Sequence, residues 1–371
     1  MNSSKINTIE AIMAVFTIIV AHTILSLQRN ILSLTKSATI LNLVYVSFFA
    51  ISLAYLIFKL LSKFPGLDII DISEYLGGKI LKNIVGFIFI SFFTVTCSLL
   101  LRSFCESLKV IYFPLTDISF IILIFMVALA LSNRLNFTAT LKANTIIMPI
   151  VFVSIIFLLV SNITNFTPER IFPILGDGFK QTFIVGIINL YSFSGIVYLY
   201  FLPPLLKEPK DLKKISLISI SICAIYLIIC VAILLFMFSF FIDTNEILPL
   251  YNATRYINFG NFFQRLESIF LLLWILAFAG YLSIITRTNS ILLKKLLKAE
   301  NPEILSDLFG LIILGISLFP KNSSITQSYE KNIFPHLVLT IVFGLGIIIL
   351  LLAFFKQRAK NRNLKGAIVN E

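Results

Sequence analysis

The sequence predicts an all-α integral membrane protein with ten transmembrane helices. Its apolar segments each run about 17–25 residues, and a helix of that length crosses a hydrocarbon core of roughly 30 Å. Hydrophobic residues make up 58% of the 371 residues, charged residues make up 13%, and the mean hydropathy is +0.98. A water-soluble domain cannot bury so much apolar surface. Because the runs are continuous and lack the alternation of barrel strands, we expect helices.

The apolar segments follow one another along almost the whole chain. They begin near Glu10, Ile40, Ile84, Ile118, Thr145, Thr182, Leu217, Phe263, Leu305 and Ile333. The first segment has only Lys5 before it and no small-residue cleavage pattern after it. We therefore expect it to be retained as a helix and not removed as a signal peptide.

The connection Asn162–Phe179, with two prolines and two glycines, divides the segments into five and five. An odd number of spans in each half makes the second half enter the membrane from the opposite side, as in inverted-repeat transporters. We therefore expect one membrane domain over residues 1–371, with a first five-helix repeat at 9–162 and a second at 179–355. Residues 356–371 form a basic tail that is expected to be cytoplasmic.

Polar and small residues interrupt the first segment of each half. In the first segment His22-Thr23 and the stretch Ser26–Asn30 break the apolar run, and in the sixth segment the break is Tyr191–Gly195. Broken helices near the midplane expose backbone N–H and C=O groups that can bind a substrate or an ion. The alternative is structural, with small residues that permit close helix packing and His22 as a packed, hydrogen-bonded polar side chain.

Ionisable residues within the apolar segments are a second signal, because a charge at the helix centre costs roughly 2.5–3.5 kcal/mol to insert. Glu267 and Arg265 are two residues apart, about 200° around a helix, and do not pair easily. Glu267 is a candidate ligand or coupling residue, with pairing across helices as the alternative. Arg102 and Glu106 are four residues apart and can pair on one helix face. With Arg265, they are candidate gating or structural charges.

The breaks and the charge together define a candidate ligand site inside the bundle. Its predicted residues are His22, Thr23, Ile24, Ser192, Phe193, Ser194, Gly195 and Glu267. We expect no catalytic residues, metal or cofactor, because the chain has two histidines and no phosphate-loop motif. Its four cysteines have no metal or disulfide spacing. The longest polar connections, about 20 residues, are too short for a catalytic domain.

The formal net charge of +12 is explained by membrane topology. If the N-terminus is cytoplasmic and there are ten spans, 20 of the 30 basic residues fall on the cytoplasmic side. This bias places both termini in the cytoplasm, and we expect no nucleic-acid partner. The connection after the second segment, from Phe64 to Lys79, has Asp71 and Glu74 near its start and Gly77-Gly78 at its end. It predicts a short amphipathic helix on the cytoplasmic surface, a candidate contact for partners.

These segments together resemble the permease-like B subunits of bacterial spore germinant receptors, in the amino acid–polyamine–organocation superfamily. The resemblance is carried, in order, by Phe64-Pro65 with Glu74-Tyr75 and Gly77-Gly78-Lys79, by Leu101-Arg102 with Glu106, by Pro173–Gly178, and by Arg265–Phe270 with Trp274. It covers residues 8–355. Two positions depart from the family pattern. His22-Thr23 stands where small residues and proline-arginine are usual, and Ile196-Val197 stands where an acidic residue is common.

The resemblance implies a LeuT-like inverted-repeat fold with broken first and sixth helices. It also implies residence in the spore inner membrane, assembly with a receptor A subunit and a lipoprotein C subunit, and recognition of a small nutrient, often an amino acid. Our leading hypothesis is a sensor that has kept a transporter's binding site. The alternative is a secondary transporter that moves an amino acid with H⁺ or Na⁺. A purely structural scaffold is disfavoured because it need not carry the insertion cost of Glu267.

The topology is testable by labelling from outside intact cells. We expect a cysteine introduced by Lys321→Cys to react with a membrane-impermeant maleimide, and one introduced by Lys213→Cys to react only after permeabilisation. External labelling at position 213 would overturn the assignment of the two sides.

Overall fold

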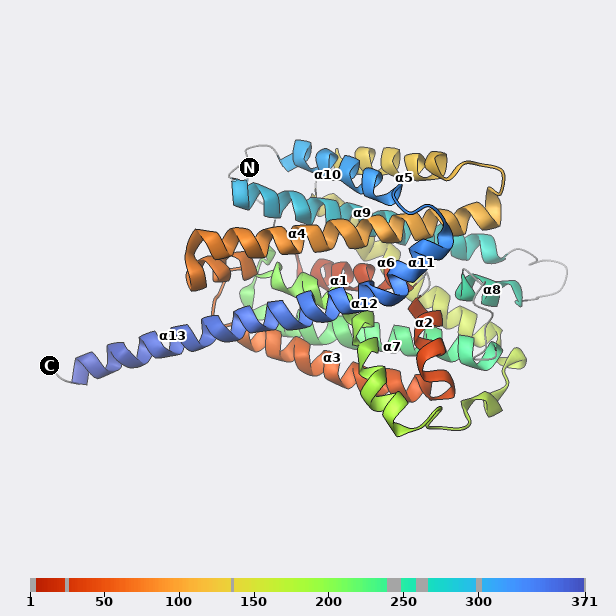
Figure 1. The fold of residues 1–371 in the computed structure, drawn as a ribbon, viewed down its shortest axis with the longest axis horizontal. Coiled ribbons are helices and arrows are strands. Elements are labelled where there is room, and N and C mark those ends of the chain that lie inside the picture. The colour runs from red at the N-terminus through yellow and green to blue at the C-terminus, as the bar shows by residue number, and fades with distance from the viewer. Residues whose placement is uncertain are drawn as a thin grey trace.

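The chain folds, in a computed structural model, into a bundle whose long helices mostly share one direction (Figure 1). The structure describes residues 5–23, 27–134, 137–238, 248–257, 266–297 and 302–369. Within those ranges, the regular secondary structure is helical apart from one isolated β-bridge between Ile6 and Leu206. The predicted all-α class is confirmed.

The helices of the described residues fall on either side of the connection between Ile171 and Lys180. The first half contains α1 (Thr8–Thr23), α2 (Leu27–Thr35), η1 (Lys36–Ala38), α3 (Thr39–Leu61), α4 (Ile69–Tyr112), α5 (Ile118–Asn133), α6 (Phe137–Ser161), η2 (Ile163–Asn165) and η3 (Pro168–Ile171). The second half contains η4 (Lys180–Ile184), η5 (Val185–Tyr200), η6 (Pro203–Leu205), η7 (Pro209–Asp211), α7 (Leu212–Met237), α8 (Pro249–Arg255), α9 (Leu266–Leu297), α10 (Pro302–Ser317), α11 (Ser323–Asn332), α12 (Phe334–Leu337), η8 (Val338–Leu345) and α13 (Gly346–Val369). Of these, η4 and η8 are π-helical and the other η elements are 3₁₀-helical.

Helices long and apolar enough to cross a membrane occur seven times in the described residues. Three shorter apolar helices, Thr8–Thr23, Ile118–Asn133 and Leu305–Ser317, lie where further spans are predicted. Together they coincide with the ten predicted apolar segments, and the chain is an integral membrane protein. The number of crossings, the repeats at 9–162 and 179–355, and the tail at 356–371 stay predictions.

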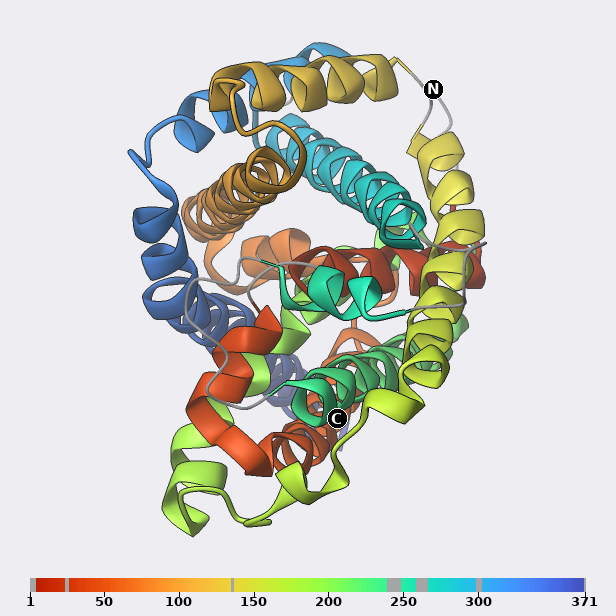
Figure 2. The same ribbon diagram turned by 90° about the vertical axis from the view of Figure 1, so that its right-hand side faces the viewer.

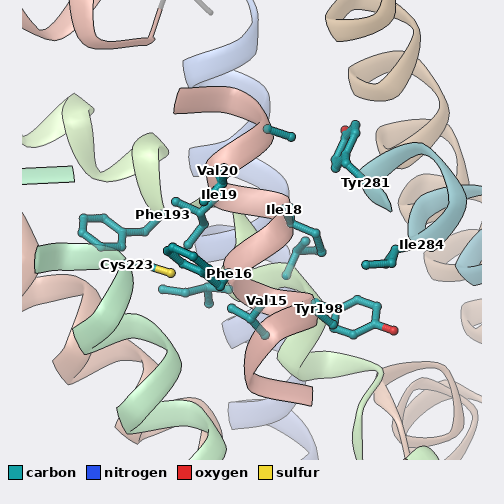
Figure 3. Close-up of a cluster of buried hydrophobic side chains, with 14 of the residues drawn as sticks. Val15, Phe16, Ile18, Ile19, Val20, Phe193, Tyr198, Cys223, Tyr281 and Ile284 are labelled. Atoms are coloured by element: carbon teal, nitrogen blue, oxygen red, sulfur yellow. The ribbon is translucent and has the colours of Figure 1, made fainter. Parts of the chain in front are cut away.

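Helix α1 lies in the middle of the bundle and packs against α6, α7, α9 and η5. The view turned by 90° shows this central position, with α5 and α10 together at the rim (Figure 2). Around α1 the packing is apolar. Phe16 and Ile19 of α1 lie in a buried cluster with Phe193 of η5, Cys223 of α7 and Ile284 of α9 (Figure 3). Since lipid is as apolar as these side chains, close van der Waals packing holds the helices together.

The amphipathic helix predicted after the second segment is present as the first part of α4. Asp68 caps it, because its Oδ1 accepts hydrogen bonds from the N–H groups of Ile70 and Asp71, both at 3.0 Å. The helix is interrupted at Gly77 and Gly78, and Gly78 has a φ of +70° that disfavours other residues. The helix and its glycine end are confirmed, while its place on the cytoplasmic surface and its contact with partners stay predictions.

Contacts between connections assign chain segments to the two ends of the bundle. At one end the Ile6 N–H donates to the Leu205 carbonyl at 2.9 Å, and Lys295 of α9 pairs with Asp68 at 2.7 Å. The C-terminal part of α13 meets the start of α4 at the same end (Figure 1). At the other end η1 meets η3, and α11 meets α4. Connections that the ten-span topology places on the same side of the membrane therefore lie at the same end of the bundle. Which end faces the cytoplasm stays a prediction.

Side chains from neighbouring helices support the carbonyls of the two π-helical regions. Asn42 of α3 donates from Nδ2 to the carbonyls of Thr182 and Gly186, at 2.7 and 3.1 Å, and its Oδ1 accepts from Asn189 at 2.8 Å. A Cβ at Gly186 would collide with the Asn42 amide. The glycine therefore leaves the space in which the amide reaches the backbone.

The same arrangement recurs at η8. The Tyr200 hydroxyl donates to the Val342 carbonyl at 2.7 Å, and a Cβ at Gly346 would lie 2.5 Å from the Tyr200 ring. A backbone group without a partner is costly in lipid. These two braces therefore permit irregular backbone at positions inside the bundle.

Loss of the Asn42 brace is expected to destabilise the protein. Asn42→Ala leaves two carbonyls without this donor and should lower the free energy of unfolding by about 1–3 kcal/mol. Thermal unfolding of the purified protein in detergent measures the effect. Asn332→Ala, the same change at an exposed position, should shift stability by less than about 0.5 kcal/mol. Equal midpoints for the two variants would contradict a bracing role.

Candidate ligand cavity

A cavity lies where α1, α2, α4, η5 and α11–α12 meet, beside the junction between α1 and α2. Its enclosed volume is about 20 Å³, room for about one ordered water, so a larger ligand requires the lining side chains to move apart. It is lined by His22, Leu27, Asn30, Thr96, Leu99, Leu100, Tyr191, Glu330 and Phe334. Segments that are far apart in the sequence therefore meet around one space inside the bundle.

Aromatic rings close part of the cavity. The Phe334 ring stacks on the His22 imidazole, with ring centroids 4.8 Å apart and planes at 17°. The Tyr191 ring meets Phe334 edge-on at 5.9 Å, and Tyr281 of α9 meets His22 edge-on at 5.7 Å. His22 is only 5% exposed. His22 is thus a packed side chain that also lines the cavity, and its role in ligand binding stays a prediction.

Glu330 brings a carboxylate to the cavity wall. The residue is 5% exposed, and Arg29 of α2, which is 8% exposed, lies close enough for the two charges to interact. Arg29 also donates from Nη2 to Oε1 of Gln327, at 3.2 Å. A carboxylate inside a membrane protein requires such a cation or a watery cavity. Glu330 has the cation, Arg29, and lies on the wall of the cavity, where its carboxylate is suited to a cationic group.

The predicted pairing of Arg102 with Glu106 is confirmed. Arg102 Nε lies 2.6 Å from Glu106 Oε1, and both side chains are less than 10% exposed. Thr326 of α11 donates to Glu106 at 3.3 Å, and Arg102 donates to the Ser317 carbonyl at 3.3 Å. The pair therefore connects α4 to α11 and to the end of α10, one helical turn from the cavity residue Glu330.

The other described residues that were predicted in the first and sixth segments are buried but do not line the cavity. Thr23 ends α1 and donates its hydroxyl to the Ile19 carbonyl at 2.7 Å. Ser192 donates to the Asn189 carbonyl. Phe193 has non-helical angles, with φ −93° and ψ 28°, so the backbone departs from regular geometry inside the predicted sixth break. Ser194 Oγ is buried with no hydrogen-bond partner.

Gly195 serves close packing. A Cβ at this position would lie 2.7 Å from Ile19 Cγ1 and 2.9 Å from the Val15 carbonyl oxygen. Only a residue without a side chain lets η5 approach α1 this closely. This contact supports the structural alternative for the small residues of the sixth segment, namely that they permit close helix packing.

Ile24 and Arg265 lie outside the described residues. Glu267 is in the first turn of α9, is half-buried, and interacts electrostatically with Tyr251 of α8. It is not among the residues that line the cavity. A role for it in ligand binding or coupling stays a prediction.

Five polar or aromatic cavity residues were not predicted from the sequence as site residues: Asn30, Thr96, Tyr191, Glu330 and Phe334. Tyr191 is the first residue of the break predicted in the sixth segment, and this position is the signal in the sequence that points to it. Glu330 lies in the polar helix α11, where a carboxylate is ordinary in the sequence. Thr96 lies in a long apolar helix where threonine is also ordinary. Among the described residues, no group of three His, Cys, Asp or Glu side chains gathers as a metal site.

Solved structures similar to this chain are transporters. A manganese transporter of Eremococcus coleocola superimposes with a TM-score of 0.57 at 12% identity, over 93% of this chain and 77% of that one. The inward-facing structure of Mhp1 superimposes with a TM-score of 0.53 at 13% identity, over 94% of this chain and 76% of that one. At these identities the likeness shows the fold alone, which this chain shares with LeuT-like transporters.

Curated relatives share both sequence and length with this chain. Spore germination protein YndE of Bacillus subtilis (strain 168) is 22% identical over 363 residues, 96% of this chain and 99% of that protein. Spore germination protein KB of the same strain is 24% identical over 306 residues, 78% of this chain and 80% of that protein. The family model described as spore germination protein matches residues 5–326. This integral membrane chain with a transporter fold belongs to the spore germination protein family.

Proposed function

We propose that this chain is the nutrient-sensing, transporter-like subunit of a spore germination receptor. The observation that carries the proposal is the cavity beside the α1–α2 junction, with Glu330 on its wall. Its relatives are named spore germination proteins, which supports a sensory use of the transporter fold. The subunit would reside in the spore inner membrane with both termini cytoplasmic, beside a receptor A subunit and a lipoprotein C subunit.

The chemistry of the cavity favours a small zwitterion such as an amino acid. The Glu330 carboxylate would pair with the ligand's ammonium group. Helix α2 begins at Leu27, and its first turn, with Leu27 and Asn30, is on the cavity wall. A helix N-terminus favours a carboxylate, so the opposite end of the ligand would lie there. The rings of His22, Tyr191 and Phe334 would contact its apolar part.

Signalling requires that the ligand bind one conformation better than another. The Phe334 ring stacks on His22 beside the ligand space, so ligand binding would shift this contact. Phe334 belongs to α12, which continues through η8 into α13. A movement at the cavity would therefore reach the opposite end of the bundle along one continuous stretch of chain.

The rival function is secondary transport of an amino acid with H⁺ or Na⁺. The likeness of the fold to solved transporters favours it. Counterflow of labelled amino acid in proteoliposomes that contain this chain alone would support transport.

The first experiment is dipicolinic acid release from spores that lack this chain, across a panel of amino acids, sugars and salts. Selective loss of the response to one nutrient class supports the receptor function and names the ligand class. An unchanged panel in spores without other family members would contradict the receptor function and leave transport.

Neutralisation of the cavity carboxylate is expected to weaken nutrient recognition. Glu330→Gln removes a charge-assisted hydrogen bond, so the half-maximal concentration for an amine-bearing nutrient should rise by roughly 10- to 100-fold. Dose–response curves of germination measure the shift at equal amounts of membrane-inserted protein. Glu169→Gln, the same change at an exposed residue of η3, is the control. Coincident curves for the two variants would remove Glu330 from the site.

Glu267 is proposed as a second ligand or coupling residue. Glu267→Gln should abolish or strongly shift the nutrient response without loss of the protein from the membrane. A normal dose response in such spores would end this role, and Glu267 would then be a helix-terminal charge at the start of α9.

A further inference from the structure

The C-terminal helix α13 continues past the end of the bundle. It runs without interruption from Gly346 to Val369 and extends beyond the ends of the other helices (Figure 1). Its side chains from Arg358 to Asn361 are exposed. At 1.5 Å per residue, the stretch from Asn361 to Val369 adds about 12 Å of helix. This length of helix stands apart from the rest of the described chain.

The base of this extension is fixed by contacts to the start of α4. Lys356 Nζ donates to the carbonyls of Tyr75 and Leu76, both at 3.0 Å, and lies 5.2 Å from the centre of the Tyr75 ring. Gln357 donates from Nε2 to the Lys63 carbonyl at 3.3 Å. These contacts set the direction in which α13 leaves the bundle, so the extension is presented at a defined angle.

The charge of the extension is entirely of one sign. Between Lys356 and Asn370 the sequence has five basic residues and no acidic residue. Topogenesis explains basic residues near a membrane, but it does not explain a helix there. Like charges four residues apart, as at Lys356 and Lys360 or Arg358 and Arg362, destabilise an isolated helix. Most helices also depend on packing for their stability. An oppositely charged surface along α13 would supply both kinds of stabilisation.

We propose that the extension of α13, residues 358–369, is a docking surface for an acidic segment of a partner protein on the predicted cytoplasmic side. Its direction disfavours a membrane surface as the partner. The extension continues the direction of the transmembrane helices (Figure 1), so its residues leave the headgroup layer and do not lie along it. The docking surface is connected through η8 and α12 to Phe334 at the cavity.

The test uses the full-length chain in sporulating cells, with a photoreactive benzoylphenylalanine in place of the exposed Ala359 or, separately, of Asn361. We expect a crosslink to one protein, and mass spectrometry should map it to a segment rich in Asp and Glu. The charge reversal Arg358→Glu, Arg362→Glu and Lys365→Glu should lower the crosslink yield roughly tenfold. Replacing acidic residues of the mapped segment with lysine should restore it.

The matched control exchanges the basic residues without a change of charge, as Arg358→Lys, Arg362→Lys and Lys365→Arg, and should keep the yield. Equal membrane levels of all variants exclude a folding defect. A crosslink to phospholipid, a crosslink to a neutral segment that survives charge reversal, or no crosslink from either position would each overturn the proposal.

Discussion

Backbone polar groups inside a lipid bilayer must find partners within the protein, and the architecture depends on how this chain meets that requirement. Regular helices meet it through their own hydrogen bonds. At the π-helical stretches η4 and η8, Asn42 and Tyr200 supply further donors to backbone carbonyls across helix interfaces. Gly186 and Gly346 make room for these side chains. The irregular backbone near the cavity is therefore a product of packing between α3, η5 and η8.

Buried charged side chains also need partners within the protein. Arg102 and Glu106 pair with each other and with groups on α10 and α11. Lys295 bridges Asp68 and Asp71, at 2.7 and 2.5 Å, at the opposite end. Each cluster connects helices that are distant in the sequence. The cavity lies between these two connected ends, so under the proposed function a ligand that moved α11 or α12 would act on elements held at both.

The sequence predicted well what depends on local patterns. The apolar segments, the helix capped by Asp68 and the Arg102–Glu106 pair follow from residues a few positions apart, and the structure contains all three. The cavity wall was predicted only in part. His22 stood out because a polar residue interrupted an apolar run. Glu330 and Thr96 did not stand out, because a carboxylate in a polar helix and a threonine in an apolar one are ordinary in their local surroundings.

The sequence by itself determined that this protein lies in a lipid bilayer, that it is helical, and which segments enter the membrane. The length and hydropathy of each segment decide these properties. Only the tertiary structure decided which polar side chains share a space. Glu330 and His22 lie on one cavity wall because Phe334 of α12 stacks on His22 of α1, about 300 residues away in the chain. Such contacts depend on helix packing, in which small residues such as Gly195 set how closely backbones approach.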